Sequence, residues 1–196
     1  MFSKYVARPF QWHTSWETLV VPRYWSDHLT NDHLSPRHPA DSATETVHVV
    51  LPNDANPLGF ILGGTVMHLI DIAGAIVSHR HTHSRVATVA VDSLEFLNPV
   101  KVGDQIILRA RITCAFRTSL EVAVEAWCEE TATGERHLTS RAFLTFVALD
   151  QDGRPTDVPS LILDNDEDRR RAEAAQGRRT ERLKKRGNLA SESFSI

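Results

Sequence analysis

Apolar and polar residues alternate with a period of two through most of the second half of the chain. The alternation runs over 104–116, where the polar positions include arginines, and over 119–129, where they are glutamates. Segments 86–96 and 138–149 have the same strand-like texture. Alternation of this length is typical of an antiparallel sheet with one face covered and the other exposed or half-exposed. Turn-forming residues separate the segments, so the pattern predicts four successive strands.

One segment has a helical period instead. Between Gly64 and His79, apolar residues recur at the spacing of one buried helical face. Residues 44–51 precede it as a first strand and are followed by a polar loop at 52–57. One helix can cover only one face of a five-stranded sheet, so we expect a two-layer α+β domain with the order strand, helix and four strands. The uncovered edge or face favours pairing with a second copy of the chain.

The composition divides the chain into three parts, of which the predicted domain occupies residues 43–160. Residues 1–42 form an N-terminal extension with three of the four tryptophans, and such bulky side chains are expected to cover a domain or a neighbouring subunit. Residues 161–196 form a C-terminal tail in which a strongly basic run follows an acidic one. We expect this tail to be a solvated helix or a flexible, disordered segment.

Charge and apolar content exclude several classes of protein. The formal net charge is −3 and the pI is about 6.4, so no global attraction to nucleic acid or to an anionic membrane is expected. Apolar runs are shorter than a membrane span, and the first ten residues lack an apolar signal-peptide segment. We therefore expect a cytoplasmic protein without a membrane partner. Cys114 and Cys128 fall in predicted strands, where a reducing compartment favours buried free thiols.

An acidic residue lies within the apolar helical run. Asp71 falls beside the buried face, about two turns from the Gly63-Gly64 pair at the start of the helix. A buried carboxylate suffers a desolvation penalty unless it is partnered or used in catalysis. A surface or salt-bridged acid on an amphipathic helix is the alternative, and the adjoining loop and glycines favour the catalytic interpretation.

Short motifs along residues 44–159 occur in a recognisable order. They comprise Asn56, Gly59, Gly63-Gly64, Leu69-Ile70-Asp71, Ala73-Gly74, Val91-Asp92-Ser93, Phe96, Pro99-Val100, Val102-Gly103-Asp104, Ser119 to Val122, Thr145 to Asp150 and Gly153-Arg154-Pro155. In this order and at this spacing they resemble the hotdog-fold acyl-CoA thioesterase family. The resemblance implies an antiparallel sheet of about five strands wrapped on one long central helix, with protomers that dimerise through their sheets.

The resemblance also implies an activity and an assembly. Members of the family hydrolyse a fatty acyl-CoA to free acid and CoA, as a homodimer or a trimer of dimers, without a metal and without a cofactor beyond the CoA of the substrate. In the family a helix aspartate and a loop asparagine act together, one from each subunit. By position these residues are Asp71 and Asn56. For Asn56 the alternative is a turn cap beside Pro57.

Thioester hydrolysis needs an activated water, a donor for the developing oxyanion and contacts to the acyl group. Asp71 is the candidate general base, or a nucleophile that forms a transient anhydride, and burial is expected to strengthen it as a base. The backbone N–H of Gly64 is the candidate oxyanion donor, worth roughly 3–4 kcal/mol in the transition state. Gly63 and Phe60 are substrate-binding candidates beside it, although the glycine pair also suits a tight loop-to-helix turn.

Further polar residues are candidates for contacts with CoA. Its phosphates call for cations, hydroxyls and N–H groups at the mouth of the site. Residues near strand ends that can supply them are Arg85, Arg117, Thr118 and Ser119. Ordinary surface arginines are the alternative. Asp92 and Glu95 are an odd number of residues apart, so strand alternation places them on opposite faces, as a polar strand end and a subunit contact.

Histidines in and near the helix are weaker candidates for functional residues. His68 lies one turn before Asp71 and is a candidate for an outer contact with it. The histidine-rich run 79–83 resembles a metal tract but lacks carboxylate or thiolate company, and His and Arg also suit the end of a helix. We therefore expect no metal site.

The sequence leaves two other functions open. One is a non-catalytic acyl-CoA sensor whose basic tail touches nucleic acid, although no DNA-reading helical domain is recognisable. The other is a hotdog hydratase or dehydratase, which would be expected to place a histidine near the helix acid, and His68 keeps this alternative open. Hydrolysis of acyl-CoA is the favoured prediction.

Overall fold

The computed structural model of the protein describes residues 34–192. Predictions for residues 1–33, including the tryptophan-bearing part of the extension, lie outside the described residues. The strands are β1 (Thr44–Val49), β2 (Arg85–Phe96), β3 (Gln105–Ala115), β4 (Ser119–Glu129) and β5 (Arg136–Leu149). The helices are α1 (Pro39–Ser42), α2 (Gly63–Thr82), α3 (Asp166–Glu192) and the short 3₁₀ turn η3 (Pro52–Asp54). The predicted order of strand, helix and four strands is confirmed, and the helix begins one residue earlier and ends three residues later than expected.

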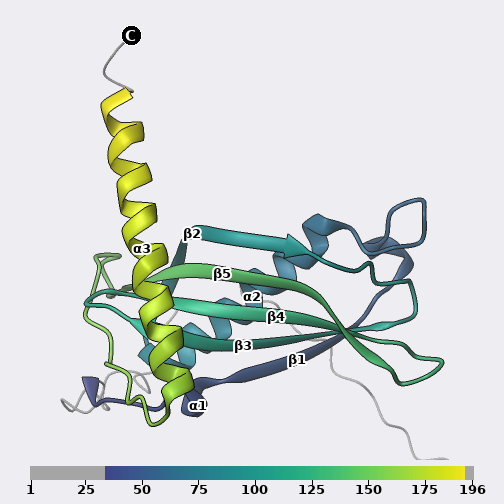
Figure 1. Ribbon diagram of the computed structural model, residues 1–196, viewed down its shortest axis with the longest axis horizontal. Helices are drawn as coiled ribbons and strands as arrows, with labels where there is room; N and C mark the ends of the chain where they lie inside the picture. The colour runs from purple at the N-terminus through teal and green to yellow at the C-terminus, as the bar shows by residue number, and fades with distance from the viewer. Residues whose placement is uncertain (1–33, 193–196) are drawn as a thin grey trace, which may run out of the picture. The chain divides into compact units, whose positions relative to one another are not determined.

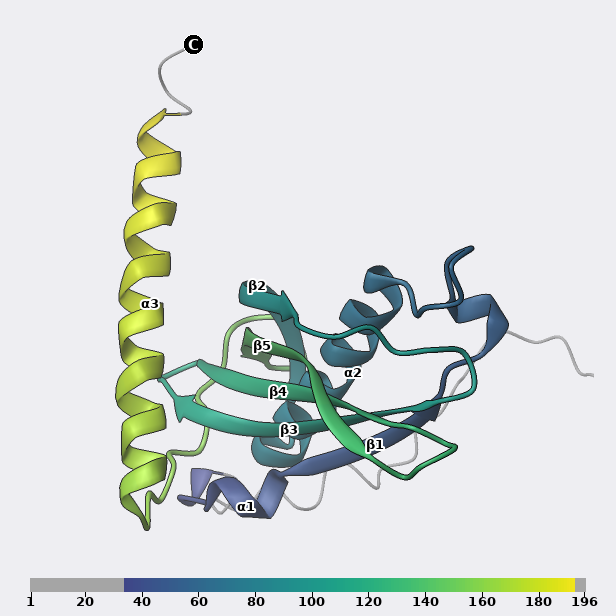
Figure 2. The same ribbon diagram turned by 45° about the vertical axis from the view of Figure 1, so that its right-hand side comes forward.

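The five strands form one antiparallel sheet with the order β1-β3-β4-β5-β2, so β1 and β2 are its edges (Figure 1). α2 lies across one face, called here the inner face, and α3 lies on the opposite, outer face (Figures 1 and 2). The two-layer α+β arrangement of the sheet and α2 is therefore confirmed, and α3 adds a helix on the second face.

Apolar side chains fill the space between α2 and the inner face. Val66, Ile70, Ala73 and Val77 of α2 are all almost fully buried, at 3% exposure or less. They pack against the alternating apolar positions of β3, β4 and β5 that the period-two pattern predicts. Gly74 permits the close approach, because a Cβ there would lie 2.8 Å from the Phe146 ring. This burial holds α2 in a fixed position on the sheet.

β2 departs from regular alternation. Its alignment with β5 contains two register shifts, which flank the pair Ala90-Val91. The prediction that Asp92 and Glu95 lie on opposite faces is therefore wrong. Asp92 accepts a hydrogen bond from the Thr145 hydroxyl at 3.3 Å, and Glu95 aligns with Arg141, on the same face of β5. Bulges change which residues of a strand share a face.

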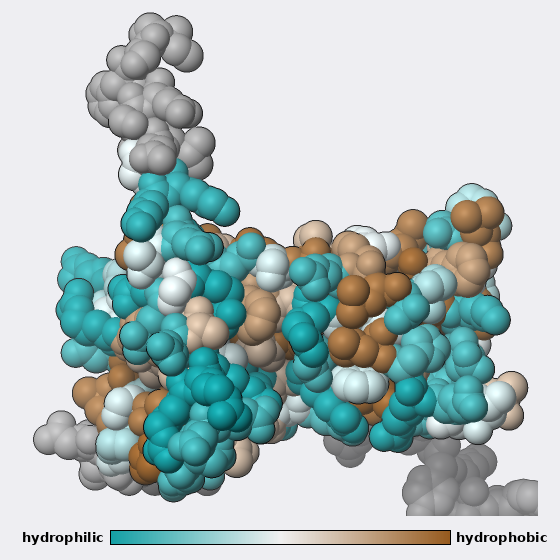
Figure 3. All heavy atoms as spheres, in the orientation of Figure 1, coloured by the Kyte–Doolittle hydropathy of each residue, from teal (hydrophilic) through white to brown (hydrophobic). Residues whose placement is uncertain are grey.

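The C-terminal tail forms a docked helix and not a disordered segment. Ion pairs tie α3 to three strands of the sheet: Asp168 to Arg111 of β3 at 2.6 Å, Arg178 to Glu121 of β4 at 2.7 Å, and Arg182 to Asp92 of β2. The helical alternative of the prediction is thus confirmed, but the helix is not simply solvated, because ion pairs join it to residues far away in the sequence. Hydrophilic side chains cover the side of α3 that faces away from the sheet (Figure 3).

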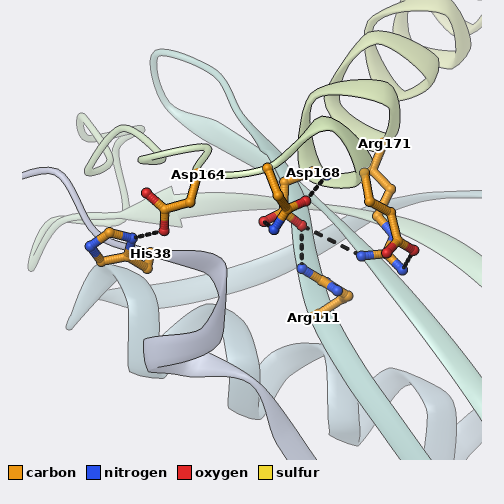
Figure 4. Close-up of polar contacts among 7 residues, drawn as sticks. His38, Arg111, Asp164, Asp168 and Arg171 are labelled. Carbon is orange, nitrogen blue, oxygen red and sulfur yellow. Dashed lines mark hydrogen bonds and ion pairs between the residues drawn. The ribbon is translucent and has the colours of Figure 1, made fainter.

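The start of α3 is fixed by a cluster of charges. Figure 4 shows Asp168 between Arg111 and Arg171, and the carboxylate of Asp168 also accepts a hydrogen bond from the Asn165 amide at 2.9 Å. These contacts satisfy a carboxylate that is only 8% exposed. The buried charge therefore has the partners that it requires.

Both cysteines lie in the interior of the domain. Cys114 and Cys128 are free and buried, as predicted. Burial raises the pKa of both thiols, that of Cys128 to about 11. Among residues 34–192, no helix is both long and apolar enough to cross a membrane.

Candidate active site

The N-terminus of α2 is open. The residue before the helix, Leu62, is extended, and among residues 34–192 no side chain caps the first turn. The first helical hydrogen bond runs from the Val66 N–H to the Leu62 carbonyl at 3.1 Å, so the N–H groups that precede Val66 point out of the helix end. A Cβ on Gly64 would meet nothing within 4 Å, whereas one on Gly63 would lie 3.3 Å from the Phe96 ring. The helix tip can therefore admit a carbonyl oxygen at Gly64.

Asn56 organises the loop that leads to this helix tip. Its Oδ1 accepts the backbone N–H groups of Leu58 at 2.9 Å and Phe60 at 3.3 Å. The alternative interpretation, a turn cap, is thus part of its role. These two bonds fix the orientation of the amide, and within the described residues its Nδ2 has no acceptor. The Nδ2 of Asn56 is left as a free, oriented donor.

Asp71 is paired with a hydroxyl. The Thr88 hydroxyl, from β2, donates to the Asp71 Oδ1 at 2.7 Å. Asp71 is half-buried on the protomer and not buried as expected, because the neighbouring edge strand leaves that side of α2 open. A carboxylate held through one oxygen keeps the other oxygen available to accept a proton.

Sequence reasoning missed Thr88. A threonine in a strand is an ordinary strand former, so its residue type carries no functional signal. One signal was available. The sequence predicts a strand over 86–96 beside the helix, and Thr88 is a polar residue on the side of that strand that faces the helix. His68, in contrast, is exposed and makes no hydrogen bond or ion pair with Asp71 in the described part of the chain.

The candidate CoA-binding residues lie at the other end of the sheet. Arg85 aligns with Leu149 and Ser119 with Val147, whereas the helix tip lies beside Phe96 at the far end of β2. A twelve-residue strand is about 40 Å long. Within one protomer, the candidate CoA-binding residues therefore lie far from the helix tip.

Individual contacts of these residues are ordinary. Arg117 is largely exposed and lies 3.8 Å from the Asp157 carboxylate, and Arg85 donates to the Asp150 carbonyl. The Thr118 carbonyl accepts the Ala148 N–H at 3.0 Å, which joins the β3–β4 hairpin to the end of β5.

Two cavities in the described part of the chain do not enclose Asp71. One of about 880 Å³ lies on the outer face between α1, α3 and the sheet, and it is lined by arginines that are mostly ion-paired. A second, of about 340 Å³, lies between β1 and the first turns of α2 and includes Thr65 and Leu69. Neither contains Asp71, whose side of α2 faces the open edge of the sheet.

The histidine run at the end of α2 has structural contacts. His81 is fully buried and its Nε2 donates to the Pro159 carbonyl at 2.9 Å, while His79 Nδ1 donates to the Ser84 carbonyl at 2.7 Å. Burial lowers the pKa of His81 and of His83. Among the residues that the structure describes, no three His, Cys, Asp or Glu side chains are grouped as metal ligands would be.

Comparisons with known proteins identify the family. A model of the thioesterase superfamily matches residues 58–135. The acyl-CoA thioester hydrolase YciA of Salmonella typhimurium is 38% identical over 114 residues, which cover 57% of this chain and 86% of the relative. The chain belongs to the acyl-CoA thioester hydrolase family. The predicted family resemblance is thereby confirmed.

Solved structures of acyl-CoA thioester hydrolases have the same fold. A hexameric acyl-CoA thioesterase is 38% identical, with a TM-score of 0.73 over 76% of this chain and 97% of the other. The acyl-CoA hydrolase of Staphylococcus aureus, solved with butyryl-CoA and CoA, is 31% identical, with a TM-score of 0.73 over 81% of this chain and 97% of the other. The predicted hotdog fold is confirmed.

The Staphylococcus aureus hydrolase was also solved as three alanine variants, at an aspartate, an asparagine and a threonine. In that protein the asparagine precedes the aspartate by 15 residues, and the threonine follows the aspartate by 17 residues.

Proposed function

We propose that the protein hydrolyses acyl-CoA to a free carboxylic acid and CoA, with Asp71, Thr88, Asn56 and Gly64 at the reacting bond. The observation that carries the proposal is the Asp71–Thr88 hydrogen bond of 2.7 Å beside an open helix tip. The spacing of Asn56, Asp71 and Thr88 in this chain equals that of the three substituted residues in the Staphylococcus aureus hydrolase. This agreement supports the assignment of all three residues.

The site needs two copies of the chain. Asp71 and Gly64 lie seven residues apart on one helix, which separates them by about 10 Å along its axis. One thioester cannot contact both at hydrogen-bond distance, because the reacting atoms of a bound substrate must lie about 3 Å from each group. We therefore assign Asp71 and Thr88 to one copy and Asn56 and Gly64 to the other. The exposed edge strand β2 supports a homodimer, and the hexameric relative supports a trimer of dimers.

The proposed reaction proceeds by addition and elimination. The Gly64 N–H and the Asn56 Nδ2 donate hydrogen bonds to the thioester oxygen, which becomes negative when water adds to the carbonyl carbon. Asp71 accepts the proton of the attacking water, while the Thr88 hydroxyl holds its carboxylate in place. The C–S bond then breaks, and the CoA sulfur receives the proton from Asp71. Only water and protein groups take part, so the proposal includes no metal and no cofactor.

The nucleophilic alternative for Asp71 can be distinguished by isotope labelling. If the carboxylate attacked the thioester and water then cleaved the anhydride at its aspartyl carbon, one turnover in ¹⁸O water would place ¹⁸O in the Asp71 side chain. Direct attack by water places the label in the released acid alone. Mass spectrometry of the Asp71 peptide after a single turnover separates the two routes.

The two competing functions receive less support. A nucleic-acid-binding tail would use the basic residues of α3, but three of its arginines, Arg171, Arg178 and Arg182, are paired with carboxylates of this chain. A hydratase would need a histidine at the helix acid, and within the described residues His68 makes no contact with Asp71.

Release of CoA thiol from a panel of acyl-CoA esters tests the proposal. We expect the wild-type protein to release CoA and Asp71→Asn to be slower by roughly 10²–10⁴-fold with unchanged folding. Mixing Asp71→Asn with Asn56→Ala should restore part of the activity, because one of the two sites in the mixed dimer then has an intact aspartate and an intact asparagine. Wild-type turnover by Asp71→Asn would refute the assignment, and failure of the mixture to recover activity would refute the shared site.

A further inference from the structure

The larger cavity, of about 880 Å³, lies on the outer face of the sheet between α1, α3 and the strands. α3 begins beside α1 and crosses the strands, so the two helices border the cavity (Figures 1 and 2). Asp71 and the open helix tip belong to the inner layer, on the other side of the sheet. Small-molecule sites typically have volumes of roughly 300–1,000 Å³. The outer cavity is therefore large enough for a ligand and separate from the candidate active site.

Small side chains open the outer cavity from two of its walls. On the sheet, Ala123 of β4 lies between Arg111 of β3 and Phe143 of β5 in the register of the strands. On α3, Ala174 has one cavity-lining arginine one helical turn before it and another one turn after it. The two alanines leave a space that the longer side chains around them enclose. The cavity thus combines an apolar surface with a rim of guanidinium groups.

Positive charge is in slight excess around the outer cavity. In the described part of the chain, six arginines and three glutamates line it. Two further carboxylates, those of Asp168 and Glu121, form ion pairs with arginines of this lining. Six cations are thus matched by five carboxylates, and one positive charge is left over. A ligand with a single negative charge would balance it.

Two of these arginines have donors without an acceptor. The side chain of Arg170 is exposed and, within residues 34–192, makes no hydrogen bond or ion pair. The Nε–H of Arg111 is buried and has no partner among the same residues, although another nitrogen of this guanidinium contacts Asp168 at 2.6 Å. A buried N–H group without an acceptor is destabilising. An anion in the cavity would supply acceptors where the protein does not.

The character of the lining favours a carboxylate over a phosphate. A phosphate ester carries close to two negative charges, which exceeds the single excess charge, and the three glutamates of the lining would repel it. A guanidinium can bind one carboxylate through two parallel N–H groups. The apolar part of the lining, which includes Phe143 and the two alanines, suits a hydrocarbon body.

We propose that the outer cavity binds a fatty acid, with its carboxylate at Arg170 and its hydrocarbon chain against Ala123, Ala174 and Phe143. The inference goes beyond the proposed function, because the outer cavity and Asp71 lie on opposite faces of the sheet. A carboxylic acid is also the product of the proposed hydrolysis. The outer cavity would then hold released acid away from the reacting groups.

Alkylation of a cysteine introduced at the cavity wall tests the binding site. Ala174→Cys places a thiol at an exposed position of the lining, and Gly177→Cys is the control on the same helix, outside the lining, where a Cβ meets nothing within 4 Å. Octanoate at about ten times its dissociation constant should slow alkylation by iodoacetamide at position 174 by about tenfold, because only roughly a tenth of the sites stay open. Alkylation at position 177 should be unchanged, as read by mass spectrometry. The native Cys114 and Cys128 are buried, with raised pKa values, so they give a low background.

Three further probes define the chemical class of the ligand. Octan-1-ol has the same chain without the charge, acetate has the charge without the chain, and inorganic pyrophosphate is a polyanion. We expect each of them to protect position 174 much less than octanoate does. Equal protection by octan-1-ol would overturn recognition of the carboxylate, and stronger protection by pyrophosphate would overturn the choice of a fatty acid.

Substitution of Arg170 tests the carboxylate contact. Arg170→Gln, made together with Ala174→Cys, should raise the octanoate concentration that gives half protection by roughly tenfold, because a charge-assisted hydrogen bond is lost. Arg186→Gln is the matched control, since Arg186 is an exposed arginine of α3 that does not line the cavity and has no ion pair in the described residues. Equal shifts for the two variants would contradict a specific contact at Arg170.

The outcomes separate this inference from the proposed function. Protection at position 174 without hydrolysis of acyl-CoA would refute the proposed function and support the outer site. Hydrolysis without protection, or equal protection at positions 174 and 177, would overturn the outer site alone.

Discussion

The inner face of the sheet, under α2, is packed with apolar side chains, whereas the outer face, under α3, carries charges in pairs. On the inner face the buried residues of α2 contact a continuous apolar surface from β3 to β5. On the outer face α3 is attached at Asp168, Arg178 and Arg182, each of which has an oppositely charged partner on a different strand. α2 is thus held mainly by apolar packing, whereas α3 is held mainly by ion pairs, together with the buried Ala175 and the contact of Arg178 with the Phe143 ring.

The difference shows that apolar burial and ion pairs determine different aspects of the fold. Burial is strong but has no preferred direction, so it fixes that α2 covers the sheet. Ion pairs are weaker in net terms but require one geometry, so they fix which residues meet. The candidate catalytic residues Asp71 and Thr88 lie at the edge of the inner layer, where α2 passes beside β2 and apolar cover ends.

Removal of Arg178 is expected to have the largest effect on stability. Glu121 is 1% exposed, and its carboxylate accepts two hydrogen bonds from Arg178 and one from Thr113 at 2.6 Å. Arg178→Ala leaves a buried charge without its cation, so we expect a loss of about 3 kcal/mol in the free energy of unfolding. Urea denaturation of the full chain measures it.

Two further variants show whether the buried charge is the cause. Adding Glu121→Gln to Arg178→Ala should recover more than half of the loss, because no uncompensated charge remains. Arg179→Ala is the matched control on the same helix, since Arg179 lies over the Phe116 ring at 4.1 Å and has no carboxylate partner in the described residues. Its effect should stay below about 1 kcal/mol. Equal losses for Arg178→Ala and Arg179→Ala would contradict the importance of the outer-face charges.

A pair of glycine substitutions separates the two faces by packing alone. Gly74→Ala on α2 puts a Cβ 2.8 Å from the buried Phe146 ring, so we expect a loss of roughly 1–3 kcal/mol despite the better helix propensity of alanine. Gly177→Ala on α3 meets nothing within 4 Å and should stabilise the protein by up to about 1 kcal/mol. Thermal unfolding of both variants shows whether their changes in stability have opposite signs. A stabilising effect of Gly74→Ala would show that the inner layer can rearrange to accept the added methyl group.

The fold followed from the sequence because the inner layer is built from local patterns. The alternation in 104–116 and 119–129 and the helical period before it require no knowledge of distant contacts, and both are confirmed. The ion pair of Glu121 with Arg178 joins residues 57 positions apart, and nothing local indicates it. The bulges of β2 likewise arise from its fit to β5, so they could not be predicted from alternation.

The candidate site was predictable where a residue type conflicts with its surroundings. Asp71 stands out as an acid in an apolar helix, and the glycine pair stands out at its start. Thr88 does not conflict with a strand, so only the 2.7 Å contact reveals it. The burial expected for Asp71 was wrong because the sequence pattern of one chain does not show that an edge strand leaves one side of the helix open.

Substitution of Thr88 probes the boundary between the two layers. Thr88→Val keeps the shape and the strand propensity but removes the donor to Asp71, and we expect kcat/KM to fall by roughly tenfold, which equals about 1.4 kcal/mol. Thr88→Ser keeps a hydroxyl and should retain most of the activity. If Thr88 only filled space in the strand, valine would replace it as well as serine does. Similar activities for the two variants would therefore argue against a positioning role for the hydroxyl.

The smallest expected effect is a dependence of stability on pH that originates in the inner-layer helix. Burial lowers the pKa of His81 below its ordinary value of 6.5, and burial also lowers that of His83. The unfolded chain therefore binds protons more readily than the folded protein just below pH 6.5, so stability is full above that pH and declines as the pH falls through it. The slope contributed by His81 cannot exceed about 1.4 kcal/mol per pH unit.

His81→Gln tests whether this one residue accounts for most of the slope. Glutamine does not titrate, and its amide can still donate to the Pro159 carbonyl that His81 contacts at 2.9 Å. Urea denaturation between about pH 7.5 and about pH 5.5 should show a decline for the wild type and a flatter profile for the variant. His83, at the end of the same helix, also has a lowered pKa and is unchanged in this variant, so part of the slope should remain. An unchanged slope in His81→Gln would assign the pH dependence to His83 or to the charged outer face, and it would contradict the role of His81.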